Sequence, residues 1–396
     1  MSDSLGIYVS IPFCKAKCSF CNFASGVFAG ARIDGYVERL AEEMRGARAY
    51  ARLMGGELPE RVDSIYFGGG TPSLLEPAVI AKVFGGLRGE FSVDTDAEVT
   101  VECAPGQMSD AGLEAWQREG VNRLSFGVQS FVDRECAAVG RLHTGAECRA
   151  ELQRMQAAGI SRLGIDLIVG LPHQTDESWR YSAEEAIASG VEHVSMYMLE
   201  VDEDSRLGRE ALAGGRRYGA GDLPDEDRVA DWYQAGCEWL DTAGLRQYEI
   251  SNFARVGGES RHNRKYWDRK PYVGFGLDAH SMLRTGLGGV RWANPDEMNE
   301  YVGLMGERGF LRTVDVVARE AAFEEALFLG LRLVDGVDLG QLDASFGMVG
   351  MIEEPVRDMT EAVLVVVEGG RLRLTGRGRM ASNEVFGRLL VGAGVF

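Results

Sequence analysis

The chain has 396 residues, of which 45% are apolar, and it carries a formal net charge of -18 at pH 7. This length predicts one large domain and a smaller one, while so acidic a surface argues against general nucleic-acid binding. No apolar run reaches the roughly 18–20 residues that a membrane span needs, and the N-terminus lacks the features of a signal peptide, so we expect a cytoplasmic protein.

The first half of the chain alternates strand-like and helix-like segments. Strands are predicted at Gly6–Ser10, Ser64–Phe67, Glu98–Cys103, Val121–Gly127, Arg162–Val169 and His193–Leu199. Amphipathic helices are predicted at Tyr36–Met54, Asp110–Arg118, Ala146–Ala157 and Asp176–Ala188, followed by a helix at Asp227–Asp241. Six strands alternating with helices predict parallel β/α units. The expected fold is α/β, an incomplete (β/α)6-type barrel, with Arg246–Ile250 as a candidate seventh strand.

After about Asn294 the pattern changes to consecutive helices and one strand pair. Helices are predicted at Asp296–Arg308, Arg319–Arg332, Leu339–Ser345, Met351–Glu361 and near Gly378–Leu390. The strands Val363–Glu368 and Arg371–Thr375 are joined by two glycines, which favour a hairpin turn. We therefore divide the chain into a barrel at 1–293 and a small, mainly helical, winged-helix-like domain at 294–396.

Three cysteines follow the first predicted strand closely. Cys14, Cys18 and Cys21 have the spacing C-x3-C-x2-C, and in a β/α barrel they would lie on the C-terminal face, where active-site loops gather. Three thiolates this close can hold one iron–sulfur cluster and leave one iron open to another ligand. The alternative is a zinc knuckle, but zinc usually takes a fourth ligand. The other four cysteines are scattered, and we expect ordinary buried or surface residues there.

Several polar or glycine residues lie at or near the ends of the later strands. Gly68–Pro72 follows the second strand, and its glycines would let the backbone approach a ligand. Glu102 ends the third strand, Gln129 follows the fourth, and Asp166 lies inside the apolar fifth strand. A buried carboxylate needs a partner, and we expect Arg141 to pair with Asp166. That pair is either a structural ion pair inside the barrel or part of a cofactor pocket.

Taken together, these motifs resemble the radical S-adenosylmethionine (radical SAM) superfamily. The resemblance implies a [4Fe–4S] cluster on Cys14, Cys18 and Cys21, with S-adenosylmethionine (SAM) bound beside it. Phe20, between the second and third cysteines, would cover the adenine. By the same resemblance, the residues in contact with the cofactor would be Tyr8, Phe20, Gly69, Gly70, Thr71, Glu102, Gln129, Arg141 and Asp166.

Within the superfamily the chain is similar to the coproporphyrinogen-dehydrogenase-like branch over nearly its whole length. The matching blocks are Tyr8–Cys14, Gly68–Pro72, Leu124–Phe131, Asp166–Thr175, Tyr248–Asn252, Gly274–Gly276, Ala279–Ser281 and Ser382–Phe386. The dehydrogenase carries a fourth cysteine two residues after the third and a longer N-terminal extension. Here that position is Phe23, and the first cysteine is already residue 14. Both features resemble the heme-chaperone subfamily instead.

A third feature agrees with that subfamily. The segment His262–Trp267 matches the HNxxYW motif associated there with heme. Histidine is a common axial ligand of heme iron, and aromatic rings offer flat faces to a porphyrin. The resemblance therefore implies that His262 contacts heme, with His280 as its competitor. The chain departs from the branch at Ser10, Asn22 and Ala104, and at Ala104 the loss of a polar side chain changes the hydrogen bonding expected near Glu102.

The leading hypothesis is a heme-binding protein that delivers heme to acceptor apoproteins, with respiratory enzymes as the expected acceptors. The resemblance further implies a flavodoxin- or ferredoxin-type electron donor. It leaves open a homodimer, a peripheral membrane association through partners, and turnover of SAM. One alternative is oxygen-independent oxidation of coproporphyrinogen III, which we predict to be absent. Another is a radical methyltransferase.

Overall fold

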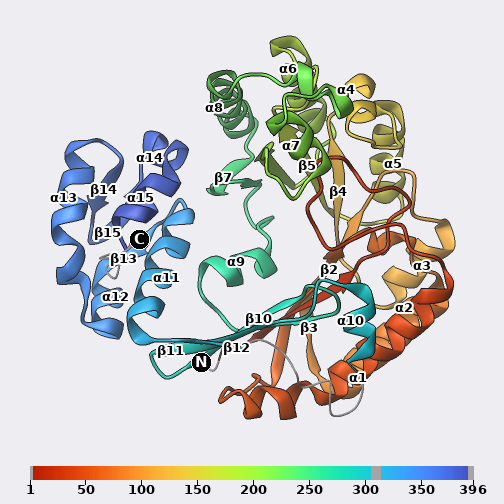
Figure 1. Cartoon of the computed structure of the whole chain (residues 1–396), viewed down its shortest axis with the longest axis horizontal. Coiled ribbons are helices and arrows are strands. Elements are labelled where there is room, and N and C mark those ends of the chain that lie inside the picture. The colour runs from red at the N-terminus through yellow and green to blue at the C-terminus, as the bar shows by residue number, and fades with distance from the viewer. Residues whose placement is uncertain (1–2, 305–313, 391–396) are drawn as a thin grey trace.

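The computed structural model describes residues 3–304 and 314–390, and its first part is built on six parallel strands. The strands lie side by side in chain order, as β1 (Leu5–Ile11), β2 (Arg61–Gly69), β3 (Ser92–Cys103), β4 (Arg123–Gln129), β5 (Arg162–Val169) and β6 (His193–Met198). All six predicted strands are present. The prediction of an incomplete β/α barrel is confirmed, and the curved sheet is visible in Figure 1.

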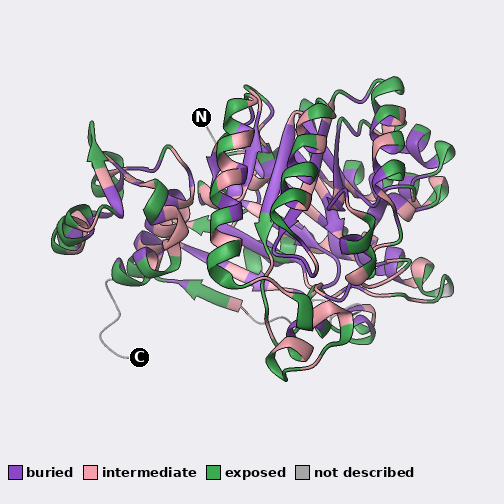
Figure 2. Ribbon diagram, turned by 90° about the horizontal axis from the view of Figure 1, so that it is seen from above, coloured by how far each residue is buried: buried purple, intermediate pink, exposed green. Residues whose placement is uncertain are grey.

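Helices cover the outer face of this sheet, with buried strands inside and exposed helix faces outside (Figure 2). They are α1 (Ala31–Leu53), α2 (Pro77–Glu90), α3 (Asp110–Arg118), α4 (Asp133–Ala138), α5 (Gly145–Ala157), α6 (Asp176–Ala188) and α8 (Glu226–Thr242). The short helix α7 (Arg206–Leu212) instead contacts the segment of the first cysteines, where the Leu207 amide donates to the Ser19 carbonyl at 2.8 Å. Local sequence sets several boundaries: Thr144 and Thr175 each form a capping box at the start of α5 and α6. Within the described ranges, no helix combines the length and apolarity needed to cross a bilayer.

The sheet extends beyond the six barrel strands at both edges. At one edge β8 (Asn252–Ala254) pairs antiparallel with β6, and β7 (Arg246–Glu249) pairs antiparallel with β8. The candidate seventh strand therefore exists, but it lies outside β8 rather than next to β6. At the other edge the sheet continues through β9 (Tyr272–Phe275), β10 (His280–Thr285), β11 (Gly288–Ala293) and β12 (Val314–Val317). The strands β7 and β12 form the two edges, so the barrel stays open on one side.

The C-terminal part packs as a separate group of helices around a small sheet (left in Figure 1). Its elements are α11 (Arg319–Arg332), β13 (Val337–Asp338), α12 (Leu339–Phe346), α13 (Glu353–Glu361), β14 (Val365–Glu368), β15 (Arg371–Leu374), α14 (Gly376–Met380) and α15 (Ser382–Arg388). Gly369 and Gly370 both adopt positive φ, which suits the tight turn between β14 and β15. The last predicted helix is divided into α14 and α15. The first, expected at Asp296–Arg308, is α10 (Met298–Gly303), and residues 305–308 lie outside the described ranges.

Ion pairs made by two buried carboxylates join the two parts of the chain. Glu325 on α11 lies 2.8 Å from Arg269 and 2.7 Å from Arg291, both from the barrel side. Arg332, at the end of α11, lies 3.6 Å from the buried Glu249. The strand β12 still belongs to the large sheet, and its Val317 shares the second hydrophobic core with Ile250 from the barrel part. The division at residues 293 and 294 therefore stays a prediction.

Candidate functional site

The cysteine loop leaves the C-terminal end of β1 and is closed at its base by backbone hydrogen bonds. The Cys14 amide donates to the Gly26 carbonyl at 2.9 Å, and the Gly26 amide donates to the Pro12 carbonyl at 2.9 Å. Cys14, Cys18 and Cys21 are all free thiols, and all three line one cavity of about 450 Å³. The loop thus presents three sulfur ligands to a single space at the active face of the barrel.

The thiols suit a multinuclear cluster better than a single ion. Within residues 3–304 and 314–390, no three His, Cys, Asp or Glu side chains converge as ligands of one metal ion. In a [4Fe–4S] cluster each thiolate binds a different iron, so the sulfurs need not converge on one point. Cys18 accepts a hydrogen bond from Arg141 Nη1 at 3.4 Å, which places a positive charge beside this sulfur. The donor set and its charge therefore fit such a cluster.

The glycine turn after β2 lies directly against the cysteine loop. Gly69 has φ of +95°, and a Cβ on Gly70 would lie 2.6 Å from the Ile11 carbonyl oxygen. Another residue at Gly69 would be strained by this φ, and a side chain at Gly70 would displace the backbone of the loop. Thr71 then donates its backbone N–H to Phe13 and its hydroxyl to the Cys14 sulfur, at 2.9 and 3.7 Å. The turn brings backbone groups of Gly69 and Gly70 to the wall of the same cavity.

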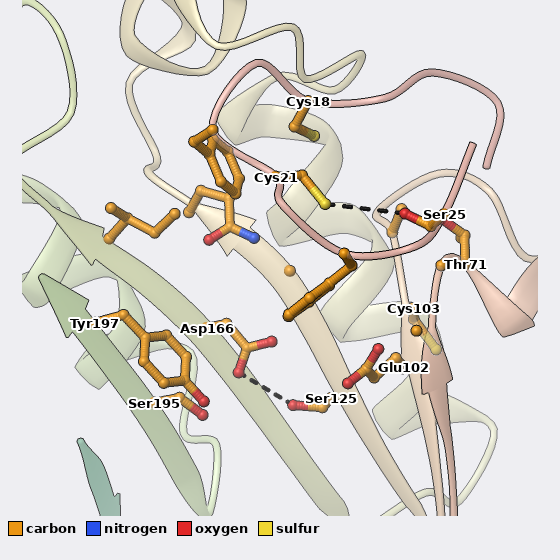
Figure 3. A pocket seen from close by; sticks show the side chains of 18 of the residues that line it. Cys18, Cys21, Ser25, Thr71, Glu102, Cys103, Ser125, Asp166, Ser195 and Tyr197 are labelled. Carbon is orange, nitrogen blue, oxygen red and sulfur yellow. Dashed lines mark hydrogen bonds between the residues drawn. The ribbon is translucent and has the colours of Figure 1, made fainter. Parts of the chain in front are cut away.

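Two carboxylates face the cavity below the cysteines (Figure 3). Burial, reinforced by the charge of Asp166, raises the pKa of Glu102 to about 7, although the hydrogen bond from Tyr66 at 3.0 Å opposes this shift. Burial also raises the pKa of Asp166, which accepts a hydrogen bond from Ser125 at 3.3 Å. Both side chains can accept hydrogen bonds from hydroxyl or amino groups of a bound molecule.

Arg141 does not form the expected ion pair with Asp166. Its guanidinium instead donates to the Cys18 sulfur and to the carbonyl oxygen of Gly127, at the mouth of the cavity. Asp166 accepts hydrogen bonds from serine hydroxyls on β4 and β6, so this buried carboxylate has polar partners without a direct contact to arginine. The sequence-based expectation was wrong on this pair because spacing along the chain does not fix the direction of a long side chain.

The remaining residues expected around the cofactor divide into two groups. The cavity is lined by Phe20, Gly69, Gly70, Thr71, Glu102, Gln129, Arg141 and Asp166, together with the three cysteines. Tyr8 is not among its lining residues. Its ring lies 6.1 Å from that of Tyr66, whose hydroxyl reaches Glu102. Tyr66, on the strand next to that of Tyr8, therefore lines the cavity where Tyr8 was expected.

Sequence reasoning also missed a set of inward-facing polar residues along three strands of the barrel. The cavity is lined further by Thr100, Arg123, Ser125, His193, Ser195 and Tyr197. They occupy alternate positions of β3, β4 and β6 that point to one side of the sheet. The signal was present in the sequence, because polar residues recur with period two along strands that are otherwise apolar.

The HNxxYW segment forms helix α9 (Arg261–Trp267), which lies between β2 and the C-terminal helix α11. His262 is fully buried and does not line the cavity. Its Nδ1 lies 3.1 Å from Ser64 Oγ and its Nε2 lies 2.9 Å from the Tyr266 hydroxyl. Burial, with a smaller effect of Lys265, lowers the pKa of His262 to about 3, so the ring is neutral. By contrast, Asn263 of the same motif lines the cavity, and His280 is exposed outside it.

Comparison with known proteins places these features in context. Residues 8–186 match the model of the radical SAM superfamily, and residues 317–381 match that of the HemN C-terminal domain. The protein named heme chaperone HemW from Bacillus subtilis (strain 168) is 33% identical, over 97% of this chain and 98% of its own length. The mitochondrial radical S-adenosyl methionine domain-containing protein 1 of Mus musculus is 35% identical, over 85% of this chain and 75% of its own length.

The fold has a counterpart among solved structures. The coproporphyrinogen III oxidase HemN from Escherichia coli superposes with a TM-score of 0.83, covering 98% of this chain and 90% of that one. Its sequence identity is 23%, so the likeness concerns the fold. The match nevertheless spans both the barrel and the C-terminal domain.

Proposed function

The chain belongs to the family of the heme chaperones named HemW, within the radical SAM superfamily, and on this premise we propose that it binds heme and delivers it to acceptor apoproteins. The observation that carries the proposal is the 33% identity over nearly the full length of both chains. Phe23, at the position of the dehydrogenase's fourth cysteine, supports it from the sequence. We further propose respiratory enzymes as the acceptors and the cytoplasm as the location.

The cofactors of this superfamily are a [4Fe–4S] cluster and SAM, and the cavity offers groups suited to both. When bound, the reduced cluster supplies an electron to the sulfonium of SAM. Cys14, Cys18 and Cys21 would hold the cluster, while Gly69 and Gly70 offer backbone groups to the methionine end. Glu102 and Asp166 would accept hydrogen bonds from the ribose and amino groups. Arg141 would keep positive charge beside the cluster thiolates.

The mouth of the cavity carries apolar surface that a porphyrin could cover. Phe23 is 60% exposed, and Tyr197 and Met198 are exposed by 42% and 38%. All three line the same cavity as the cysteines. Exposed rings next to a cofactor pocket favour a large, flat, apolar ligand. We propose that heme lies against this rim.

An electron donor of the flavodoxin or ferredoxin type would dock beside the cysteine loop. Lys15 is exposed there, and Lys17 donates to the Phe23 carbonyl at 3.0 Å. The chain as a whole has a net charge of -18, so these two lysines form a local positive patch to which an acidic partner could bind. Replacing both with glutamate should slow cluster reduction by the donor and leave reduction by dithionite unchanged.

The heme ligand is tested by comparing two histidines. To reach an iron, His262 must leave its buried position and give up one of its hydrogen bonds, to Ser64 or to Tyr266, whereas His280 is exposed with only Nδ1 near the Asp278 carbonyl. Heme titration of wild type, His262→Ala and His280→Ala should show a changed heme spectrum and a lower affinity in the variant that lacks the ligand. If His262→Ala keeps the wild-type spectrum and affinity, His262 is not the ligand.

The proposed function as a whole is tested by binding and transfer. The anaerobically reconstituted protein should bind heme and pass it to an apoprotein acceptor, with transfer followed by the acceptor's spectrum. It should form no protoporphyrinogen from coproporphyrinogen III under strict anoxia. Efficient oxidation of coproporphyrinogen, or failure to bind heme, would contradict the proposal.

A further inference from the structure

The cavity has an inner end that the cofactor residues do not fill. Figure 3 shows Ser125 and Ser195 on the side of Asp166 away from Cys18 and Cys21. Arg123 and His193 precede these serines by two residues on the same strands, β4 and β6, and line the same cavity. Barrel interiors are usually filled by apolar side chains, so this group of polar residues calls for a ligand.

His193 carries the clearest sign of a missing partner. The residue is 3% exposed, and its Nδ1 has no hydrogen-bond partner among the described residues. Its Nε2 lies 3.0 Å from the Tyr248 hydroxyl, which accepts the Ser260 amide at 3.4 Å and keeps its own proton to donate to the ring. On this basis we assign the proton of the neutral ring to Nδ1, which becomes a buried donor. Such a donor is costly unless something accepts from it.

A glycine on the neighbouring strand, Gly164 of β5, is paired with His193. A Cβ built on Gly164 would lie 3.4 Å from Ser125 Oγ and 3.5 Å from His193 Nδ1. Because Gly164 has no side chain, the space between these two polar atoms stays free. A ligand oxygen could lie above the glycine and accept from the imidazole.

The charge at this inner end favours an anion. The fully buried Glu98 is paired with two arginines, Arg162 at 3.0 Å and Arg123 at 3.8 Å. One carboxylate therefore faces two guanidinium groups, and their charge also lowers the pKa of His193, after burial as the main cause. The carboxylates that line the cavity are Glu102, Asp166, Glu200 and Asp202. Asp166 lies nearest the inner end, 3.3 Å from Ser125, and burial raises its pKa, which favours its neutral form beside a second carboxylate. Asp202 instead accepts a hydrogen bond from Asn22 of the cysteine loop.

We infer that the inner end of the cavity, over Gly164 and between Ser125 and His193, binds a carboxylate of a second ligand beside SAM. The inference rests on the proposed function, under which this carboxylate is a propionate of heme. His193 Nδ1–H would donate to it, while Arg123 would supply the nearest positive charge. His193 is then a specificity residue that selects porphyrins with free propionates.

The experiment compares two ligands and a matched pair of variants in the full-length, reconstituted protein. Heme and its dimethyl ester are titrated under identical detergent conditions. Wild type should bind free heme at least about tenfold more tightly, because a hydrogen bond to a charged group is lost in the ester. His193→Gln keeps a polar atom near Nε2, for Tyr248, but loses the cavity-facing donor, so it should lose the preference. His193→Asn keeps a donor near Nδ1 and should retain most of it.

A steric variant gives independent evidence. Gly164→Ala meets only ordinary van der Waals contacts and should fold normally, yet its methyl group would occupy the floor of the subsite. It should bind heme and the diester with equal affinity. Equal binding of both ligands by wild type would overturn the subsite while leaving heme binding intact, whereas binding of neither would refute the proposed function itself. If His193→Gln weakens SAM and leaves the heme preference unchanged, the propionate assignment is wrong.

Discussion

The cysteine loop (residues 12–26) and helix α9 both carry a short sequence motif, but their side chains are held in opposite ways. In the loop, Cys14 and Cys21 are half-buried and face an open cavity. In α9, His262 is fully buried, with both ring nitrogens hydrogen-bonded. The loop thus presents its motif to a ligand, while α9 uses much of its motif to pack inside the protein.

The contacts of α9 explain this difference. Lys265 is buried and lies 2.7 Å from Asp63, and the guanidinium of Arg332 lies 4.3 Å from the centre of the Trp267 ring. The helix therefore ties the barrel to the C-terminal domain. Ser260 and Asn263, at its N-terminal end, line the cavity. A motif can thus combine residues that touch a ligand with residues that place the helix.

The largest expected effect concerns the cysteine loop. Cys14→Ala, Cys18→Ala and Cys21→Ala should each abolish the iron–sulfur absorbance after anaerobic reconstitution, because each removes one iron ligand. Cys103→Ala is the matched control, since Cys103 lines the same cavity but its sulfur donates to the Val101 carbonyl at 3.5 Å. Full clusters in all three loop variants would refute the assignment.

Breaking an ion pair between the barrel and the C-terminal domain should lower the stability of the protein strongly but leave the cluster in place. Glu325→Gln would leave the buried Arg269 without its carboxylate, while the more exposed Arg291 keeps its contact with Asp315. Breaking a buried pair costs about 3–5 kcal/mol. Chemical denaturation should report this loss, while cluster absorbance should stay at the wild-type level. The exposed pair of Arg180 and Glu184 offers a control, where Glu184→Gln should change stability by less than about 1 kcal/mol.

The shifted pKa of Glu102 in the cavity predicts that the folding stability of the cofactor-free protein depends on pH. Because burial raises the pKa of Glu102 to about 7 from 4.5, the folded state keeps a proton there that the unfolded state has lost. Stability should therefore fall as pH rises from 4.5 to about 7, by at most about 1.4 kcal/mol per pH unit from this group. Denaturation curves of Glu102→Gln should show a shallower dependence. An identical slope in both proteins would mean that Glu102 ionises normally.

The smallest effect is expected at the rim of the cavity. Phe23→Ser removes an exposed ring, so it should change the free energy of unfolding by less than about 0.5 kcal/mol. Heme affinity should nevertheless fall several-fold if the ring lies against the porphyrin. Val256→Ser, at an exposed site outside the cavity, should change neither quantity. Unchanged heme affinity in the Phe23 variant would show that the porphyrin does not lie against this rim.

Much of the fold and of the cofactor end followed from the sequence because the signals are local. The apolar run of β5 and the glycines that end α3, α5 and α6 set the strands and helices of the barrel. The spacing of the three cysteines after β1 placed them on one loop. Parallel strands end at the same edge of the sheet, so Glu102 and Gln129 were expected near that loop, and both line its cavity.

Only the tertiary structure decided the features that depend on contacts between distant segments. Arg141 reaches the cysteine loop rather than Asp166, and β8 inserts between β6 and β7. The sequence presented His262 as an available ligand, but Ser64, almost 200 residues away, completes its burial. A helix of seven residues has no periodicity long enough to show which face turns inward. The inward face of α9 is determined by its packing between β2 of the large sheet and α11 of the C-terminal domain.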